Sequence, residues 1–250
     1  MALNPDLITR LKRVRPARLL VASGAGISAE SGIPTYRGEN GLWRTLNFEE
    51  MATREAFLKD RERLWNWYQE RRQGVLNANP NAAHYAVADL VRNTPEAFVA
   101  TQNVDDLHER AGLPLDRLAH VHGRILETRC EHCGLVTVAS PSDPVRRCTR
   151  CNHLALRPNV VWFDEELPEA EVERVDRFLA QGPCDVVLVV GTTASFDYVR
   201  DWIERAAGKS GLVIDVNPDT SHVTDAFPER AWHLRQPASL ALPDVARSLT

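Results

Sequence analysis

The 250-residue chain contains no apolar run that approaches the length of a membrane-spanning helix. Its N-terminal region has no continuous hydrophobic segment of the kind found in a removable presequence, and the Arg-rich residues 10–18 lead straight into the first apolar run. Internal repeats, low-complexity tracts and heptad repeats are also missing. These absences argue against a membrane partner, a repeat protein and a coiled coil, and we expect a globular cytoplasmic protein.

Positive charge is not in excess either. Lys and Arg number 30 against 34 Asp and Glu, so the formal net charge is −4 and gives no general attraction to phosphates. We therefore expect no nucleic acid partner. The length, together with 44% hydrophobic residues, is sufficient for a complete core and favours one large domain with a small insert over two equal domains.

Cysteine is scarce, yet four of the five cysteines form two Cys-x-x-Cys pairs, Cys130, Cys133, Cys148 and Cys151. Two such pairs across a short polar stretch are typical of a tetrahedral zinc site. Redox dithiols are the alternative, but turn-forming residues surround both pairs in place of a strand-to-helix junction. Four thiolates complete the coordination of zinc, so the metal is predicted to be structural and to hold an insert at residues 123–158. His132 and His153 are alternative ligands, although solvated turn positions are the simpler interpretation, and Cys184 is expected in the core or at its edge.

Four apolar runs alternate with helical patterns, and they lie at Leu19–Ala22, Ala97–Ala100, Val186–Val190 and Leu212–Val216. This alternation predicts an α/β fold with a doubly wound, Rossmann-like parallel sheet that helices cover on both faces. We expect residues 1–122 and 159–250 to form that domain. The zinc-ribbon insert then occupies 123–158, and part of the helical stretch at 48–76 forms a small helical module.

The first apolar run leads directly into Gly24-Ala25-Gly26. Gly24 permits a tight turn, Gly26 lets backbone N–H groups approach a diphosphate, and the small Ala29 lets a following helix pack closely with its N-terminus towards the phosphates. An ordinary strand-to-helix turn is the alternative. Residues 32–34, Gly-Ile-Pro, are expected to end the helix early and to leave a flexible loop after them.

Three segments resemble the signature of the sirtuin family in order and spacing. They are the glycine-rich run at residues 18–43, the run Thr-Gln-Asn-Val-Asp-Asp-Leu-His-Glu-Arg-Ala-Gly at 101–112, and Val121-His122-Gly123. The resemblance extends from about Leu19 to Asn217. It implies an NAD-dependent protein deacylase that acts on acylated lysine in protein substrates and yields nicotinamide, O-acyl-ADP-ribose and free lysine, with NAD and zinc as cofactors.

By the same resemblance, the catalytic residues are His122, Asn103 and Asp105. An imidazole with an ordinary pKa of about 6.5 accepts a proton at neutral pH, which suits His122 as the base that acts on a ribose hydroxyl. Asn103 orients the ribose hydroxyl or a water, and Asp105 accepts the carboxamide N–H of nicotinamide. Both follow an apolar run at its carboxyl end, where open α/β sheets bind ligands, although helix capping is the alternative role for such residues.

The resemblance implies that NAD contacts the glycine-rich turn as well as Asn103 and Asp105. It also implies contacts of NAD with Thr35, Tyr36, Arg37, Gln102, Gly191, Thr192, Thr193 and Asn217. Arg37 is expected to hold phosphate or the developing intermediate, and Tyr36 stands where sirtuins usually carry Phe. Residues 194–199, Ala-Ser-Phe-Asp-Tyr-Val, depart from the family pattern of a small residue followed by Val and Pro. This departure lies beside the expected position of the phosphate and the adenosine ribose.

Trp65, Tyr68 and Arg71 recur at three-residue intervals, so they lie on one helical face. From the spacing alone, this face is most simply a solvated, Arg-rich one. The run nevertheless resembles the Tyr-x-x-Arg element of class III sirtuins, in which both side chains bind the terminal carboxylate of a succinyl, malonyl or glutaryl group. A guanidinium holds a carboxylate through two parallel N–H bonds, so we expect a preference for these acidic groups, with acetyl also accepted.

The resemblance also implies that Val161 and Phe163 pair with the backbone of the peptide substrate. Asp164 stands where the family usually has Gly, and it adds a charge beside the peptide. If this charge weakens peptide binding, reactions of NAD other than deacylation remain alternatives. These alternatives are mono-ADP-ribosyl transfer and NAD hydrolysis, which share the first chemical step. A non-enzymatic NAD-sensing module is a further alternative, against which His122 and Asp105 argue because binding alone needs no base.

Overall fold

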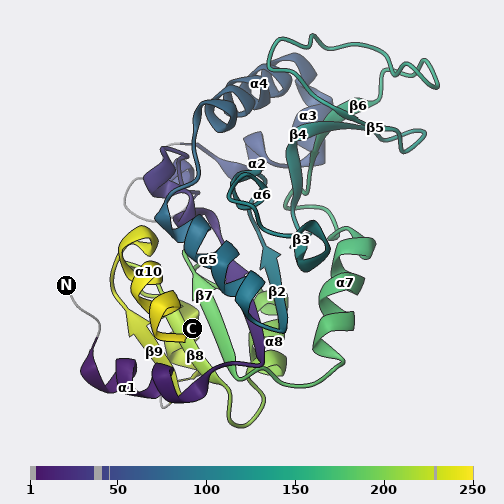
Figure 1. Cartoon of the computed structure of the whole chain (residues 1–250). Coiled ribbons are helices and arrows are strands. Elements are labelled where there is room, and N and C mark those ends of the chain that lie inside the picture. Colours follow the sequence, from purple (N-terminus) through teal and green to yellow (C-terminus); the bar gives the residue numbers. More distant parts are fainter. Residues whose placement is uncertain (1–3, 37–40, 45, 228–229, 250) are drawn as a thin grey trace.

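The computed structural model describes residues 4–36, 41–44, 46–227 and 230–249. Its larger part is built on a parallel sheet of six strands in the order β3-β2-β1-β7-β8-β9 (Figure 1). The strands are β1 (Arg18–Ser23), β2 (Glu96–Thr101), β3 (Leu118–His120), β7 (Val186–Val190), β8 (Leu212–Val216) and β9 (Ala231–Leu234). All four apolar runs of the sequence are strands of this sheet, which confirms the predicted doubly wound α/β fold.

Helices cover both faces of the main sheet (Figure 1). One face carries α1 (Pro5–Val14), α5 (Ala82–Asn93) and α10 (Ala238–Leu249), and the other carries α7 (Glu169–Leu179), α8 (Asp197–Ala207) and α9 (His222–Ala226). Strand β1 is buried at every residue, with Leu19 and Val21 in the first core and Leu20 and Ala22 in the second. Because successive side chains of a strand point to opposite faces, a doubly covered strand requires such an uninterrupted apolar run.

A smaller part of the molecule lies above the main sheet in Figure 1. It combines α2 (Phe48–Met51), α3 (Arg54–Lys59) and α4 (Arg61–Asn77) with an antiparallel sheet in the order β5-β4-β6. The strands of this sheet are β4 (Gly123–Cys130), β5 (Val136–Val138) and β6 (Leu156–Val160). Phe57, Leu64 and Trp65 from the helices share one core with Ile125 and Leu156 from the sheet. The helices and the cysteine-bearing insert therefore bury each other's apolar side.

The turn after β1 differs from the predicted close-packed helix. Two 3₁₀ helices of three residues follow instead, η1 (Ala25–Ile27) and η2 (Ala29–Ser31), and Gly32 ends the second with a φ of +87°. The glycines and the following proline leave too few residues for a longer helix. Gly26 is needed for another reason, because a Cβ at this position would lie 2.6 Å from Cα of Gly191 after β7. The remaining short elements are η3 (Leu42–Arg44), α6 (Leu107–Arg110) and η4 (Leu115–Arg117).

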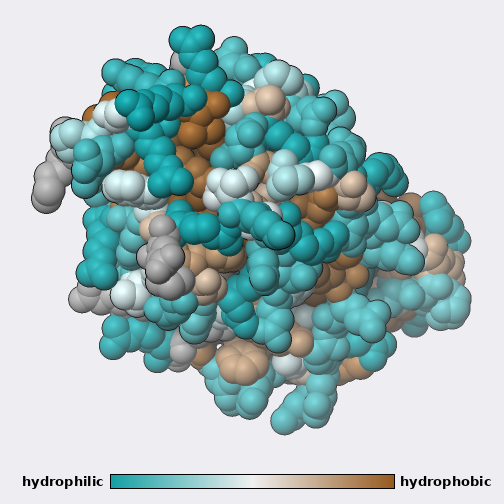
Figure 2. Space-filling view, turned by 90° about the horizontal axis from the view of Figure 1, so that it is seen from below, coloured by the Kyte–Doolittle hydropathy of each residue, from teal (hydrophilic) through white to brown (hydrophobic). Residues whose placement is uncertain are grey.

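Among the residues that the structure describes, no helix is long and apolar enough to cross a membrane. The face of the molecule shown in Figure 2 is mostly hydrophilic, and hydrophobic residues appear there in separate areas. Scattered apolar residues of this kind are normal on the surface of a folded protein.

Candidate functional site

A cavity of about 1570 Å³ lies at the carboxyl ends of β1, β2 and β7 and extends to the smaller part of the molecule. The loops after β1 and β7 line one side of it, and Trp67, Tyr68 and Trp162 line the other. Strands β1 and β7 are neighbours at the position where the strand order reverses, which is where doubly wound sheets bind ligands. The cavity is therefore the candidate site.

Backbone amides meet at the edge of this cavity. The N–H of Gly26 donates to the carbonyl of Gly191 over 2.8 Å, so this amide joins the two loops and does not face a ligand. Within the described ranges, the amides of Ala25, Thr192 and Thr193 donate to no protein acceptor, although all three residues line the cavity. Amides left without partners in such a concave loop pair fit the oxygens of a diphosphate.

Side chains that follow two other strands, β2 and β8, support the loop after β7. Gln102 Nε2 donates to Thr192 Oγ1 over 2.9 Å, and Asn217 Nδ2 donates to the Thr192 carbonyl over 3.1 Å. All three residues line the cavity. The other predicted cofactor residues that line it are Gly24, Ala25, Gly26, Thr35, Tyr36, Asn103, Gly191 and Thr193. Arg37 lies outside the described residues.

His122 stands in the turn between β3 and β4 and lines the cavity. Its Nδ1 lies 3.0 Å from the carbonyl oxygen of Gln102, and its Nε2 lies 2.5 Å from the hydroxyl of Tyr198. Because a carbonyl only accepts, Nδ1 carries the proton, and Nε2 is the basic atom that accepts from Tyr198. Burial lowers the pKa of His122 to about 4, with the Gln102 carbonyl opposing this in part, so the imidazole is neutral at pH 7.

Asn103 and Asp105 follow β2 and meet Ser28 from the loop after β1. Asn103 Nδ2 donates to the Ser28 hydroxyl over 3.1 Å, and this hydroxyl donates to Asp105 Oδ2 over 2.9 Å. Asn103 lines the cavity, whereas Asp105 lies behind it and is nearly completely buried. Burial raises the pKa of the Asp105 carboxyl, against the effect of hydrogen bonds from Leu107 and Ser28. The structure therefore brings Asn103 to the cavity and places Asp105 behind it, connected through Ser28.

The four cysteines of the two pairs converge, and their sulfur atoms all lie within 4.8 Å of one another. The sulfur–sulfur distance is 3.6 Å in two pairs, Cys130 with Cys151 and Cys133 with Cys148. Tetrahedral zinc with sulfurs at about 2.3 Å places them about 3.8 Å apart, so this group fits a structural zinc ion. His132 and His153 stack at 3.6 Å between ring centres, and among the described residues neither joins the group. Cys184 is buried in the core of the main sheet, as predicted.

Comparison with known proteins identifies the family of the chain. Residues 24–197 match the model of the Sir2 family. The chain belongs to the Sir2, or sirtuin, family. It is 40% identical over 241 residues to NAD-dependent protein deacylase 1 of Archaeoglobus fulgidus, with 95% of each chain covered. It is 42% identical over 219 residues to an NAD-dependent protein deacylase of Thermus thermophilus, with 85% of this chain and 84% of the relative covered.

Solved Sir2 structures share the fold of this sirtuin. A Sir2 homologue in complex with NAD aligns with a TM-score of 0.86 at 37% identity, covering 99% of this chain and 94% of the homologue. The ADP-ribose complex of a mutant Sir2 homologue aligns with a TM-score of 0.88 at 36% identity, covering 99% and 96%. The agreement extends over the main sheet and the cysteine-bearing part together.

On the other side of the sirtuin's cavity, α4 supplies Tyr68 and Arg71. Tyr68 is 4% exposed, and its hydroxyl oxygen accepts the indole N–H of Trp162 over 2.8 Å. Arg71 lies behind the cavity lining, where its Nη2 donates to the Tyr36 hydroxyl over 2.8 Å and its guanidinium lies 4.8 Å from the Trp67 ring centre. Its Nε is buried without a hydrogen-bond partner in the described part of the chain. The face that spacing alone would leave solvated is therefore largely buried.

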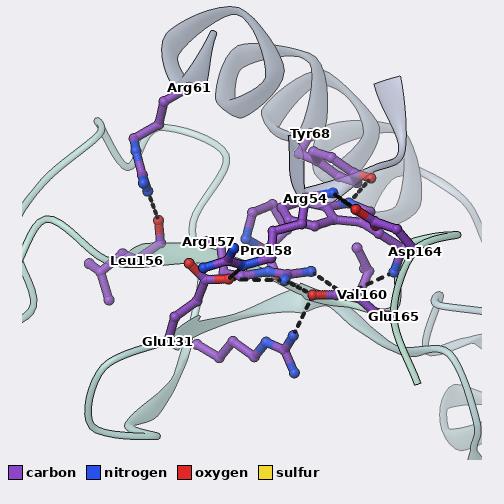
Figure 3. Close-up of polar contacts among 12 residues, drawn as sticks. Arg54, Arg61, Tyr68, Glu131, Leu156, Arg157, Pro158, Val160, Asp164 and Glu165 are labelled. Carbon is purple, nitrogen blue, oxygen red and sulfur yellow. Dashed lines mark hydrogen bonds and ion pairs between the residues drawn. The ribbon is translucent and has the colours of Figure 1, made fainter. Parts of the chain in front are cut away.

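Asp164 is occupied by a contact within the protein. Both carboxylate oxygens accept the amide N–H of Arg54, at 2.9 and 3.0 Å, and so cap the first turn of α3 (Figure 3). A carboxylate is favourable at this end of a helix because the first amides have no partner within it. The departure from the family's glycine is thus explained by α3, and Asp164 is not among the residues that line the cavity.

Val161 and Phe163 line the cavity, but their amides are engaged within the sirtuin. The N–H of Val161 donates to the carbonyl of His122 over 2.9 Å, and the N–H of Phe163 donates to the carbonyl of Ala52 over 3.0 Å. In the present conformation these two amides therefore do not bond to a peptide that lies along this segment.

Two residues that shape the cavity have no role in the sequence-based interpretation. Arg157 on β6 is completely buried, its guanidinium lies 3.3 Å from the ring centre of Trp162, and it pairs with Glu165 (Figure 3). Trp162 in turn donates a hydrogen bond to Tyr68. The contact between Arg157 and Trp162 therefore helps to fix the part of the cavity lining that Trp162 and Tyr68 form. A single Arg between Leu156 and Pro158 carries no signal of such a role. Tyr198 contacts His122, and the unusual segment 194–199 was its only signal.

Proposed function

We propose that this sirtuin is an NAD-dependent protein-lysine deacylase that prefers succinyl, malonyl and glutaryl groups and also accepts acetyl. The observation that carries the proposal is the neutral His122, which keeps Nε2 unprotonated at the cavity lining. The relatives at 40% and 42% identity, both named NAD-dependent protein deacylases, support it.

In this proposal NAD is consumed, and it supplies the ribose carbon that takes the acyl oxygen as nicotinamide leaves. The unpaired amides of Ala25, Thr192 and Thr193 bind its diphosphate. Asn103, held by the Ser28 hydroxyl, orients a ribose hydroxyl, and Asn217 at the end of β8 lies on the adenosine side. These residues follow different strands of the main sheet, and all of them except Ser28 line one cavity.

His122 receives one proton in the reaction. A ribose hydroxyl loses a proton as its oxygen attacks the carbon of the acyl group, and Nε2 of His122 gains one. The ring becomes an imidazolium, which the carbonyl of Gln102 stabilises through Nδ1–H. Addition of water then leaves free lysine and O-acyl-ADP-ribose.

The acidic-acyl preference rests on Tyr68, Arg71 and Tyr36. The Tyr68 oxygen accepts from Trp162, so its own O–H stays available as a donor to a carboxylate. Arg71 contributes positive charge from behind Tyr36, and its unpartnered Nε would gain a partner if a carboxylate reached it. A succinyl carboxylate that entered this aromatic part of the cavity without these donors would be costly to desolvate.

Asp164 was the feature that kept ADP-ribosyl transfer to other acceptors open. Its carboxylate caps α3, so the charge is compensated by a helix end and does not argue against a peptide in the cavity. Among the described residues, no other observation favours that reaction.

The test is the time course of nicotinamide release with succinyl-lysine, acetyl-lysine and unmodified peptides of one sequence. Deacylation predicts release that depends on the acyl peptide, together with the loss of the acyl mass from the peptide. Release that is independent of any peptide would indicate NAD hydrolysis. A peptide that gains the mass of ADP-ribose would indicate transfer, and either result would overturn the proposal.

A further inference from the structure

Tyr198 lies in the first turn of α8, within the segment 194–199 that departs from the family pattern. It lines the cavity, and its hydroxyl lies 2.5 Å from Nε2 of His122. A neutral imidazole whose Nδ1–H is held by Gln102 has one lone pair in its ring plane, at Nε2. No second hydroxyl can donate to this atom while Tyr198 keeps its position.

The ring of Tyr198 is held by aromatic neighbours. It stacks on Phe196 at 5.6 Å between ring centres, and it meets Trp202 edge to face at 5.0 Å. Trp202 is itself buried in the core of the main sheet. Turning the Tyr198 ring away would break both contacts, so the hydroxyl stays on Nε2 of His122. Burial raises the pKa of this hydroxyl, which therefore keeps its proton at neutral pH.

We propose that Tyr198 is a catalytic residue that passes the proton of the substrate hydroxyl to His122. The inference rests on the proposed deacylation. As the ribose O–H bond breaks, its proton binds the Tyr198 oxygen, and the proton of Tyr198 moves to Nε2 of His122. Tyr198 is neutral before and after the step, and His122 becomes an imidazolium. The ribose oxygen uses the freed electron pair to form its bond to the acyl carbon.

The variant Tyr198→Phe removes one oxygen and keeps the ring. Two reactions are measured on it. Exchange of labelled nicotinamide into NAD in the presence of an acyl-lysine peptide reports the step before proton transfer, and O-acyl-ADP-ribose formation reports the step that needs the base. We expect exchange within about threefold of wild type, product formation lowered about tenfold to a hundredfold, and unchanged KM values for NAD and peptide.

The matched control is Tyr85→Phe, because Tyr85 on α5 is 49% exposed and lies outside the cavity lining. It should leave both reactions unchanged. A second readout needs no turnover: NMR titration of the His122 imidazole, with His122→Ala to assign its signals. The Tyr198 hydroxyl stabilises the neutral ring, so Tyr198→Phe should raise the pKa of His122, and Tyr85→Phe should not.

Product formation within about threefold of wild type in Tyr198→Phe would remove this residue from the proton route. A parallel loss of exchange and product formation would also overturn the proposal, because Tyr198 would then support binding or packing. An unchanged pKa of His122 would show that the hydroxyl does not bond to Nε2. If the wild-type protein shows no peptide-dependent exchange, the proposed deacylation itself is wrong.

Discussion

Replacing Arg71 with methionine keeps most of the aliphatic side chain and removes the guanidinium. In the structure this group donates to the Tyr36 hydroxyl over 2.8 Å and keeps a buried Nε without a partner among the described residues. A hydrogen bond to a charged group contributes about 1.5–3 kcal/mol. A succinyl carboxylate loses such a bond in the variant, whereas a neutral acetyl group has none to lose. We therefore expect the ratio of kcat/KM for desuccinylation over deacetylation to fall about tenfold to 150-fold.

Both constants are measured by mass spectrometry on one peptide sequence that carries either succinyl-lysine or acetyl-lysine. Arg63→Met is the control, since Arg63 is an exposed residue of the same helix outside the cavity lining, and it should leave the ratio unchanged. Tyr68→Phe should lower the ratio by less, because it removes one neutral donor. Equal loss of both activities in Arg71→Met would mean that Arg71 supports α4 and its aromatic neighbours, and the acidic-acyl preference would be wrong.

His122→Ala should retain NAD binding in calorimetry and lower deacylation by at least about a hundredfold, so turnover within a few-fold of wild type would exclude it as the base. The purified protein should contain about one zinc per chain. Removal of the zinc by a chelator should abolish the hydrogen-exchange protection of β4–β6. A folded, active preparation without zinc would show that the four cysteines do not form a structural zinc site. Asp164→Ala should lower the free energy of unfolding by about 1 kcal/mol through loss of the α3 cap, and Asp164→Asn should lower it less; equal denaturation midpoints for the three proteins would refute the capping role. Burial lowers the pKa values of His84, His108 and His122 to about 4, 3 and 4. The unfolded chain therefore binds more protons than the folded one below its histidine pKa of about 6.5, and the free energy of unfolding should fall by up to about 4 kcal/mol per pH unit as pH drops from there towards 4. Equal urea midpoints at about pH 5 and pH 7 would disprove this linkage.

Local patterns were enough to predict four of the six strands of the main sheet and the metal ligands. A strand buried on both faces is recognisable from a few consecutive apolar residues, as in Val186–Val190, and a zinc knuckle from one Cys-x-x-Cys pair. The positions of Gln102 and Asn103 at the cavity were also predictable, because the carboxyl ends of parallel strands meet at one edge of the sheet.

Tertiary structure alone decided what several of these side chains contact. Tyr198 bonds to His122 across 76 residues of sequence, Asp164 caps α3 at Arg54 across 110, and Trp162 donates to Tyr68 across 94. Tyr68 and Trp162 meet in the core of the smaller part, and Tyr198 reaches His122 from a helix that packs on the main sheet.

In the turn after β1, too, the sequence predicted one part of the structure and the tertiary packing decided another. Its glycines were visible in the sequence, but the need for Gly26 comes from Gly191, whose backbone would lie within 2.6 Å of an added Cβ. Periodicity and spacing describe the neighbours of a residue along the chain. Contacts between loops that are distant in sequence depend on how the layers of helices and strands pack. The position of each loop is set by the strand or helix that carries it, and that element is held in place by the burial of its own apolar residues.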